Sequence, residues 1–194
     1  MKIIAQQMSE AVSHPISDGA TEQLASILVR TEVSKSKLLL REGEISNLMY
    51  YVESGLLRQF CYKNGKEMTE HFALEGSIFT SIDSFFCRMP TCTMIEAVEP
   101  ATLYGIPYIP LMTLINDCRE ISSLYRCIIE KMLVNIQKRI FAFRFETAGE
   151  RYARLLRERP DIVRRVPLIY IASYLLMSPE TLSRVRAGIL GGLT

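Results

Sequence analysis

Residues 119–145 contain neither glycine nor proline, so the chain can form an unbroken helix over this whole range. Apolar side chains recur three or four residues apart, which is the spacing that places them on one helical face. They are Ile121, Leu124, Tyr125, Ile128, Met132 and Ile136. A helix of this length extends about 40 Å, which is too long for one small domain to cover. We therefore predict dimerisation through this face, the alternative being that it packs only on the chain's own β-domain.

The segment before this helix has the pattern of a β-domain. Between residues 36 and 107, short runs rich in β-branched and aromatic residues alternate with turn signals, which is typical of a sandwich or barrel. The runs are separated by Gly43, Gly55, Gly65 and Gly76. The pair Asn64-Gly65 predicts a hairpin, because both positions of a type I′ turn need a positive φ. Short helices are expected over residues 18–33 and 108–116.

After the long helix, residues 147–159 are expected to form another helix. Thr147 is its N-cap candidate, and Glu150 stands at the third helical position, which is the spacing of a capping box. Pro160 ends this helix, because proline cannot continue it. A basic link over residues 161–167 leads to the final segment.

Residues 168–187 have the pattern of two short helices joined by a tight turn. The first has an apolar face, with the small residue Ala172 where the helices would cross. Ser178 is a good N-cap for the second helix, and Pro179 suits its first position. Leu182 and Val185 then face inward while the polar residues face out. This is the pattern of a helix-turn-helix whose second helix enters a major groove.

The polar face of that second helix has the chemistry to read base edges. Glu180 could accept from the cytosine N4 amine, and Arg184 could donate to guanine O6 and N7. The candidate DNA-binding residues are Ser178, Glu180, Thr181, Ser183, Arg184 and Arg186. The alternative is that Glu180 and Arg184 form only a surface pair one helical turn apart.

Charge is divided along the chain in a way that favours a polyanionic partner. Residues 1–118 contain 9 Lys and Arg against 14 Asp and Glu, whereas residues 119–194 contain 14 against 7. The C-terminal part is therefore expected to meet DNA. A solvated helix face is the plainer explanation, which charge alone does not exclude.

Other classes of protein fit the sequence poorly. No apolar run could span a bilayer, and the first residues lack the core of a signal peptide, so a cytoplasmic location is expected. The five cysteines include no CxxC pair, and His14 and His71 lie far apart, which argues against a zinc site or a disulfide scaffold. No nucleophile–base pair or phosphate loop stands out, so we predict that the chain is not an enzyme.

Taken together, the chain resembles the Crp/Fnr family (cyclic-AMP receptor protein / fumarate–nitrate regulator) of bacterial transcription factors. The resemblance covers residues 36–187 and rests on LLLREGEISNLMYYVESGLLR, the NGKE hairpin at 64–67, the long helix, and IASYLLMSPETLSRV. It implies an α+β fold with three parts. These are an antiparallel β-roll sensor (a jelly-roll-like double-stranded β-helix) over residues 1–118, a dimerisation helix over 119–145, and a helix-turn-helix domain over 146–194.

The resemblance also implies partners and an effector site. The partners are a second copy of the chain, double-stranded DNA with a palindromic site, and RNA polymerase. The candidate effector pocket comprises Gly76, Thr80, Ser81, Arg88, Thr91 and Cys92. Thr80-Ser81 replaces the family's Gly-Glu pair and Thr91-Cys92 its Arg-Ser pair, and Arg88 would substitute only in another loop register. A buried phosphate would lack a fixed cation, so we predict no tight binding of cyclic AMP.

Two further departures concern cofactors and the DNA-binding end. No cysteine precedes Cys61, so an iron–sulfur cluster is not expected, and His71 is a lone candidate for haem that is better explained as structural. Leu176 occupies a turn position usually filled by glycine, and residues 187–194 are too short for the usual wing. A second hypothesis follows, in which a ligand-sensing β-roll acts through protein partners and the helix-turn-helix is degenerate.

Overall fold

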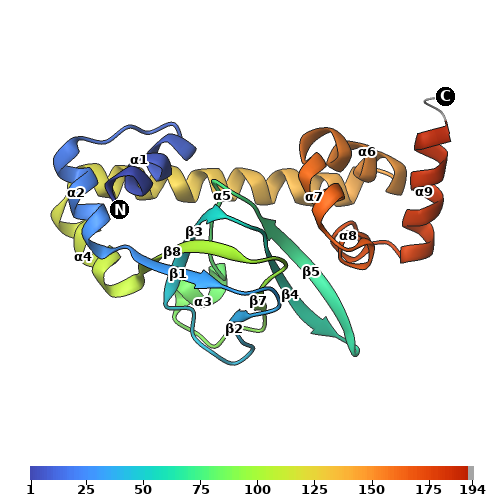
Figure 1. Ribbon diagram of the computed structural model, residues 1–194, viewed down its shortest axis with the longest axis horizontal. Helices are drawn as coiled ribbons and strands as arrows, with labels where there is room; N and C mark the ends of the chain where they lie inside the picture. Colours follow the sequence, from blue (N-terminus) through green and yellow to red (C-terminus); the bar gives the residue numbers. More distant parts are fainter. Residues whose placement is uncertain (192–194) are drawn as a thin grey trace. The chain divides into compact units, whose positions relative to one another are not determined.

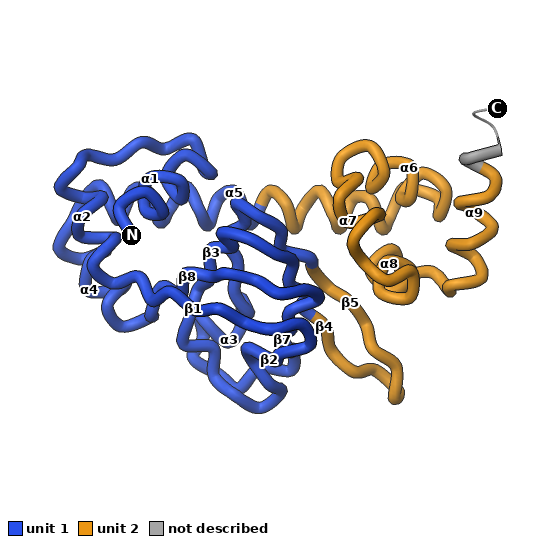
Figure 2. The backbone as a smooth tube through the Cα atoms, in the orientation of Figure 1, with its two compact units in different colours: residues 1–59, 72–133 blue, residues 60–71, 134–194 orange. Residues whose placement is uncertain are grey.

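The computed structural model describes residues 1–191, and it divides the chain into two compact units (Figure 2). The first unit comprises residues 1–59 and 72–133, and the second comprises residues 60–71 and 134–194. Two strands and the long helix contribute to both units. Among residues 1–191, every helix is too short or too polar to span a lipid bilayer.

The first unit is a β-domain with flanking helices (Figure 1). Its helices are α1 (Lys2–Ala11), α2 (Asp18–Ile27), α3 (Ile82–Cys87) and α4 (Tyr108–Asp117). Its strands are β1 (Val29–Val33), β2 (Leu38–Leu40), β3 (Leu48–Ser54), β6 (Ile78–Phe79), β7 (Met94–Ala97) and β8 (Ala101–Pro107). Strands β4 (Leu57–Lys63) and β5 (Lys66–Ala73) begin or end in this unit, and their hairpin belongs to the second.

The strands form two four-stranded sheets, in the orders β1-β8-β3-β6 and β2-β7-β4-β5. Neighbouring strands β1 and β8 are antiparallel, as are β3 and β8, and β2 and β7. The predicted glycines turn the chain between strands, since all four have positive φ. Asn64 and Gly65 have φ values of 52° and 73°, which confirms the predicted hairpin turn.

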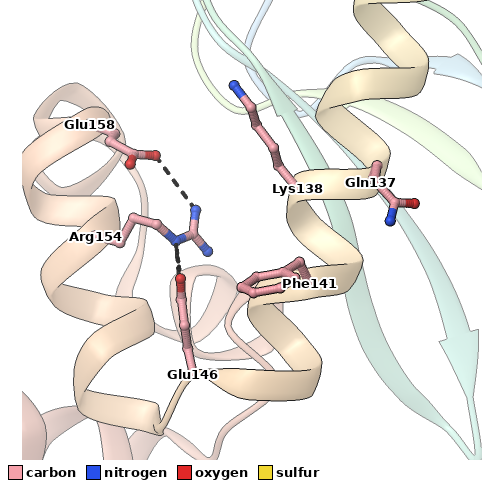
Figure 3. Close-up of a pocket in the computed structure, with 6 residues that line it drawn as sticks. All are labelled: Gln137, Lys138, Phe141, Glu146, Arg154 and Glu158. Atoms are coloured by element: carbon pink, nitrogen blue, oxygen red, sulfur yellow. Dashed lines mark hydrogen bonds and ion pairs between the residues drawn. The ribbon is translucent and has the colours of Figure 1, made fainter.

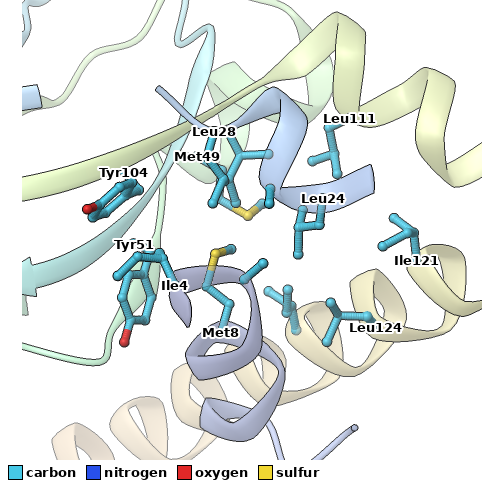
Figure 4. Packing of buried hydrophobic residues seen from close by; sticks show 14 of the residues in the cluster. Ile4, Met8, Leu24, Leu28, Met49, Tyr51, Tyr104, Leu111, Ile121 and Leu124 are labelled. Carbon is cyan, nitrogen blue, oxygen red and sulfur yellow. The ribbon is translucent and has the colours of Figure 1, made fainter. Parts of the chain in front are cut away.

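Alternation along β3 separates two hydrophobic cores. Tyr50 points between the sheets, where it packs with Leu57, Phe79 and Leu103. Tyr51 points the other way, into a core formed by helices α1, α2 and α4 and the first half of α5 (Figure 4). The sheet therefore buries apolar side chains on both faces, and helix α5 begins anchored to the β-domain.

The second unit contains four shorter helices after the end of α5 (Arg119–Phe145). They are α6 (Ala148–Glu158), α7 (Pro160–Arg165), α8 (Leu168–Tyr174) and α9 (Pro179–Gly191). Their core includes Tyr152, Leu155, Ile171 and Leu182, each no more than 5% exposed. The C-terminal segment that was expected to be too short for a wing falls partly on residues 192–194, which lie outside the described residues.

Two expectations about helices need correction, and one helix was not anticipated. Residues 18–33 are not one helix, because the β-branched run from Val29 to Val33 pairs with β8 instead. The basic link after Pro160 is helical, and proline begins α7 at a position where its missing N–H costs nothing. Helix α1 was not predicted. It carries no side-chain cap and is held by burial of Ile4, Ala5 and Met8.

Candidate functional site

The turn between α8 and α9 ends the first helix with a left-handed residue. Leu176 has a φ of 53°, which confirms that the position suits glycine. Its N–H donates to Ser173 O at 3.1 Å, and the Met177 N–H donates to Ala172 O at 3.0 Å. These two bonds constitute a Schellman motif, which satisfies carbonyls that the helix end would otherwise leave free. The turn is therefore regular in its bonding despite the leucine.

A basic side chain from α6 supports the same turn. Arg151 Nε donates to Leu175 O at 3.0 Å, and its Nη1 donates to Glu146 O at 2.7 Å. Helix α6 is itself fixed by the predicted capping box, in which Thr147 and Glu150 exchange side-chain and backbone hydrogen bonds. The carbonyl that ends α8 thus receives a charged donor from a neighbouring, well-capped helix.

Helix α9 begins as the sequence predicts. The Thr181 N–H donates to Ser178 Oγ at 3.2 Å, so Ser178 is the N-cap, and Pro179 follows at the first helical position. Leu182 is completely buried. Ala172, where α8 and α9 were expected to cross, is completely buried as well. The two helices therefore pack through small and aliphatic side chains and leave the polar face of α9 outward.

That polar face remains accessible. Glu180, Ser183 and Arg184 are exposed, and Thr181 and Arg186 are partly buried. A hydrogen bond from Ser178, and then its own backbone N–H, lowers the pKa of the Glu180 carboxyl, with smaller contributions from Arg184 and Lys66. Glu180 is therefore a carboxylate at neutral pH and an acceptor only. The Glu180 acceptor and the Arg184 guanidinium donor therefore lie one helical turn apart near the exposed start of α9.

Helix α5 has two halves with different surroundings. Ile121, Leu124 and Ile128 are at most 5% exposed, in the core with α1, α2 and α4 (Figure 4). Tyr125 and Met132 pack against the same core. Ile121, Leu124 and Ile128 are therefore already buried within one chain, so we assign the proposed dimer contact to the part of the helix beyond them.

The second half of α5 exposes several large apolar side chains. Leu133 is 64% exposed, Ile136 is 41% exposed and Ile140 is 46% exposed. Their spacing of three and then four residues is that of a coiled-coil seam. Val134 and Phe141, beside this row, are also exposed. Of the six predicted dimer residues, Ile136 alone lies in this exposed row.

The predicted effector pocket contains a cluster of three hydroxyl groups within hydrogen-bond distance of one another, formed by Ser81, Thr91 and Thr93. The oxygen–oxygen distances are 2.9 Å for Ser81–Thr91, 3.2 Å for Ser81–Thr93 and 3.1 Å for Thr91–Thr93. Gln59 donates to Thr93 at 2.9 Å, and Ser81 donates to Asp83 at 2.9 Å. All three hydroxyl residues are at most 4% exposed. Each of these hydroxyl groups has a hydrogen-bond partner, and the side-chain donors that reach the cluster are uncharged.

The other predicted pocket residues do not complete an anion site. Arg88 donates to Ser46 O at 2.7 Å and to Asn47 Oδ1, and its guanidinium lies 4.1 Å from the centre of the Tyr108 ring. Cys92 is exposed, whereas Thr80 is buried and donates to Leu48 O at 3.0 Å. Gly76 forms a turn with positive φ. Among the described residues, no three His, Cys, Asp or Glu side chains gather as metal ligands.

An open hollow of about 470 Å³ lies between the end of α5 and α6 (Figure 3). Arg154 in its wall bonds Glu146 at 3.0 Å and reaches Glu158 at 3.6 Å. The remaining lining residues are Gln137, Lys138 and the exposed ring of Phe141. Arg154 is already paired with two carboxylates, which leaves Lys138 as the other positively charged residue of the lining.

Comparison with known proteins agrees with this arrangement. Residues 30–118 match the model of the cyclic nucleotide-binding domain. FixK2 from Bradyrhizobium japonicum superposes with a TM-score of 0.71 over 86% of each chain, at 18% identity. A Crp/Fnr-family protein from Eubacterium rectale gives 0.71 over 91% of this chain and 85% of its own, at 17% identity.

The chain has the fold of the Crp/Fnr transcription regulators. The c-di-GMP-responsive regulator CLP from Xanthomonas campestris shares it, with a TM-score of 0.71 over 91% of this chain and 93% of its own, at 16% identity. A search by sequence among curated proteins finds no match. The predicted α+β architecture, with an antiparallel β-domain, a long helix and C-terminal helices, is thereby confirmed.

Proposed function

We propose that the chain is a homodimeric transcription regulator that binds a palindromic DNA site through α9. The observation that carries this proposal is the exposed end of α9, where Glu180 and Arg184 stand on a capped helix packed against α8. A helix of this kind fits the major groove, and these two side chains can read cytosine and guanine. The Crp/Fnr fold supports the same role.

Dimerisation is supported by the exposed half of α5. An aliphatic row of Leu133, Ile136 and Ile140 on one helix is costly to leave in water, and a second copy would bury it in a parallel or antiparallel helix pair. A dimer with twofold symmetry would present two α9 helices, so its preferred DNA should contain two half-sites about one helical turn apart. RNA polymerase is a further proposed partner for a regulator of this kind.

The alternative of a degenerate helix-turn-helix was motivated by Leu176 and by the expected lack of a wing. The Schellman bonds and the Arg151 contact stabilise the turn at Leu176, which weakens the first of these two reasons. The effector of the β-domain is proposed to be something other than cyclic AMP, because the hydroxyl cluster lacks a cation for a phosphate.

Selection from random DNA followed by affinity measurement tests the proposal. We expect enrichment of a palindrome, and affinity that falls steeply with salt as bound counterions are released. Arg184→Ala should cost about 1–3 kcal/mol for each half-site and relax the base preference there. Arg157→Ala, which removes the same charge from the exposed surface of α6, is the matched control and should keep the preference. Failure of the wild-type chain to enrich any palindrome would contradict specific recognition.

A further inference from the structure

The hairpin between β4 and β5 is bonded to the first helix of the helix-turn-helix. Residues 60–71 belong to the same compact unit as α6–α9 (Figure 2). The Thr69 N–H donates to Ser173 Oγ at 2.7 Å, and Ser173 Oγ donates to Glu67 O at 3.1 Å. One hydroxyl on α8 therefore uses both its donor and its acceptor on alternate residues of β5.

A stacked arginine reinforces this contact. The guanidinium carbon of Arg139 on α5 lies 4.8 Å from the centre of the Tyr174 ring and 5.2 Å from that of Phe143. Both distances are within the range of cation–π attraction. Burial lowers the pKa of Arg139, while Tyr174 and Glu70 act in the opposite direction. Side chains from α5, α8 and β5 thus meet beside Ser173.

The contact leaves the recognition surface open. Ser173 and Tyr174 lie at the end of α8, whereas Glu180, Ser183 and Arg184 on α9 stay exposed while the hairpin is bonded. Helices α8 and α9 share a core of Ala172, Leu175 and Leu182, each at most 2% exposed. A restraint on α8 is therefore also a restraint on α9.

We propose that Ser173 is a positioning residue for DNA recognition, fastening the β4–β5 hairpin to α8 and so holding α9 ready to bind. This inference rests on the proposed function and adds how the recognition helix is held. Two half-sites at a fixed spacing must be met together, so a restrained helix loses less orientational freedom on binding. A single half-site imposes no such requirement. The hydroxyl should therefore matter for the palindrome and not for the half-site.

The test compares Ser173→Ala, Ser173→Thr and the wild-type chain on the selected palindrome and on one isolated half-site. With Ser173→Ala, which removes both hydrogen bonds of the hydroxyl, we expect palindrome affinity to fall about three- to tenfold. Half-site affinity should stay within about twofold by the same reasoning. Ser173→Thr keeps the hydroxyl and should restore palindrome affinity. Ser26→Ala, which removes a hydroxyl bonded only within α2, is the matched control and should have no effect.

Amide hydrogen exchange gives a second measurement that needs no DNA. The Thr69 amide should exchange several-fold faster in Ser173→Ala, while amides in the α8–α9 core keep their protection. An unchanged Thr69 amide would overturn the proposed contact. If Ser173→Ala lost the same affinity on the palindrome and on the half-site, the change would have damaged the helix-turn-helix locally. If its palindrome affinity stayed the same or rose, Ser173 would not position α9. Either result overturns the inference. A wild-type chain that selects no DNA contradicts the proposed function instead, and the exchange result then stands by itself.

Discussion

Leu176 adopts a conformation that costs a residue with a side chain about 1–2 kcal/mol. The side chain is 49% exposed, so it recovers little of this cost by burial. We expect Leu176→Gly to raise the free energy of unfolding by about 0.5–1 kcal/mol, measured by urea denaturation. Leu175→Gly is the matched control: Leu175 has a φ of −86° and is 2% exposed, so this change should destabilise the second unit instead. A loss of stability in Leu176→Gly would contradict the assigned strain.

His71 offers a second prediction for a single residue. Burial, and then the positive charges of Arg139 and Arg159, lower the pKa of its imidazole to about 4. An unfolded histidine titrates near about 6.5, so the unfolded chain binds more protons between these values. Stability is therefore complete above pH of about 6.5 and is lost as the pH falls towards about 4, by at most about 3 kcal/mol.

We expect His71→Gln to flatten that dependence. Thermal midpoints measured at intervals between pH of about 7 and about 4.5 should fall less in the variant than in the wild-type chain. His14→Gln in the first unit is the control, and it should leave the wild-type profile in place. Parallel profiles for His71→Gln and the wild-type chain would refute the assignment.

Local patterns at single residues could be predicted where the sequence itself carries the cause. The Ser178 N-cap, the left-handed Leu176 and the capping box at Thr147 all depend on neighbours within four residues. The Ser173 contact joins residues 104 apart in the sequence, so no local pattern signals it. The position of Arg88 was equally hidden, because its partners Ser46 and Asn47 come from a distant loop.

At the scale of elements, helix α5 shows that a correct helix prediction does not settle what covers the apolar face of the helix. Its range was predicted to the residue, since no glycine or proline interrupts it. Its whole apolar face was assigned to a second copy of the chain, because we did not predict helix α1, which packs against the first half of that face. Periodicity shows that a face is buried, whereas what buries it depends on tertiary contacts. The exposed row from Leu133 to Ile140 is the part left for a second copy.

This division predicts different outcomes in the two halves of α5. Ile136→Asp places a charge in the exposed row, so it should dissociate the proposed dimer in sedimentation velocity while leaving the monomer folded. Leu124→Ala removes a side chain that is 2% exposed, so it should lower the free energy of unfolding by about 2–5 kcal/mol. It should not change the oligomeric state. A dimer that survives Ile136→Asp would rule out this row as the interface.

At the scale of the whole molecule, the domain fold and the site chemistry lead to different expectations about the ligand. Residues 30–118 match the cyclic nucleotide-binding domain, yet Ser81, Thr91 and Thr93 bond one another and Arg88 is engaged with Ser46, Asn47 and Tyr108. Burying a cyclic phosphate there would break the hydrogen bonds of the hydroxyl groups. No cation of the cluster would then offset the desolvation of the anion. The fold could be predicted from glycine spacing and strand pattern, whereas ligand preference depends on a few side chains that the fold does not dictate.

We therefore expect cyclic AMP at about 1 mM to leave the thermal midpoint of the first unit unchanged within about 1 °C. A ligand with a dissociation constant of about 10 µM would instead stabilise it by about 2.7 kcal/mol, which corresponds to a shift of at least about 5 °C. Adenosine 5′-monophosphate at the same concentration controls for nonspecific anion effects. A shift with the cyclic nucleotide and none with the control would show that the hydroxyl cluster opens to accept it. Equal, negligible shifts would leave the β-domain as a sensor for some other ligand class.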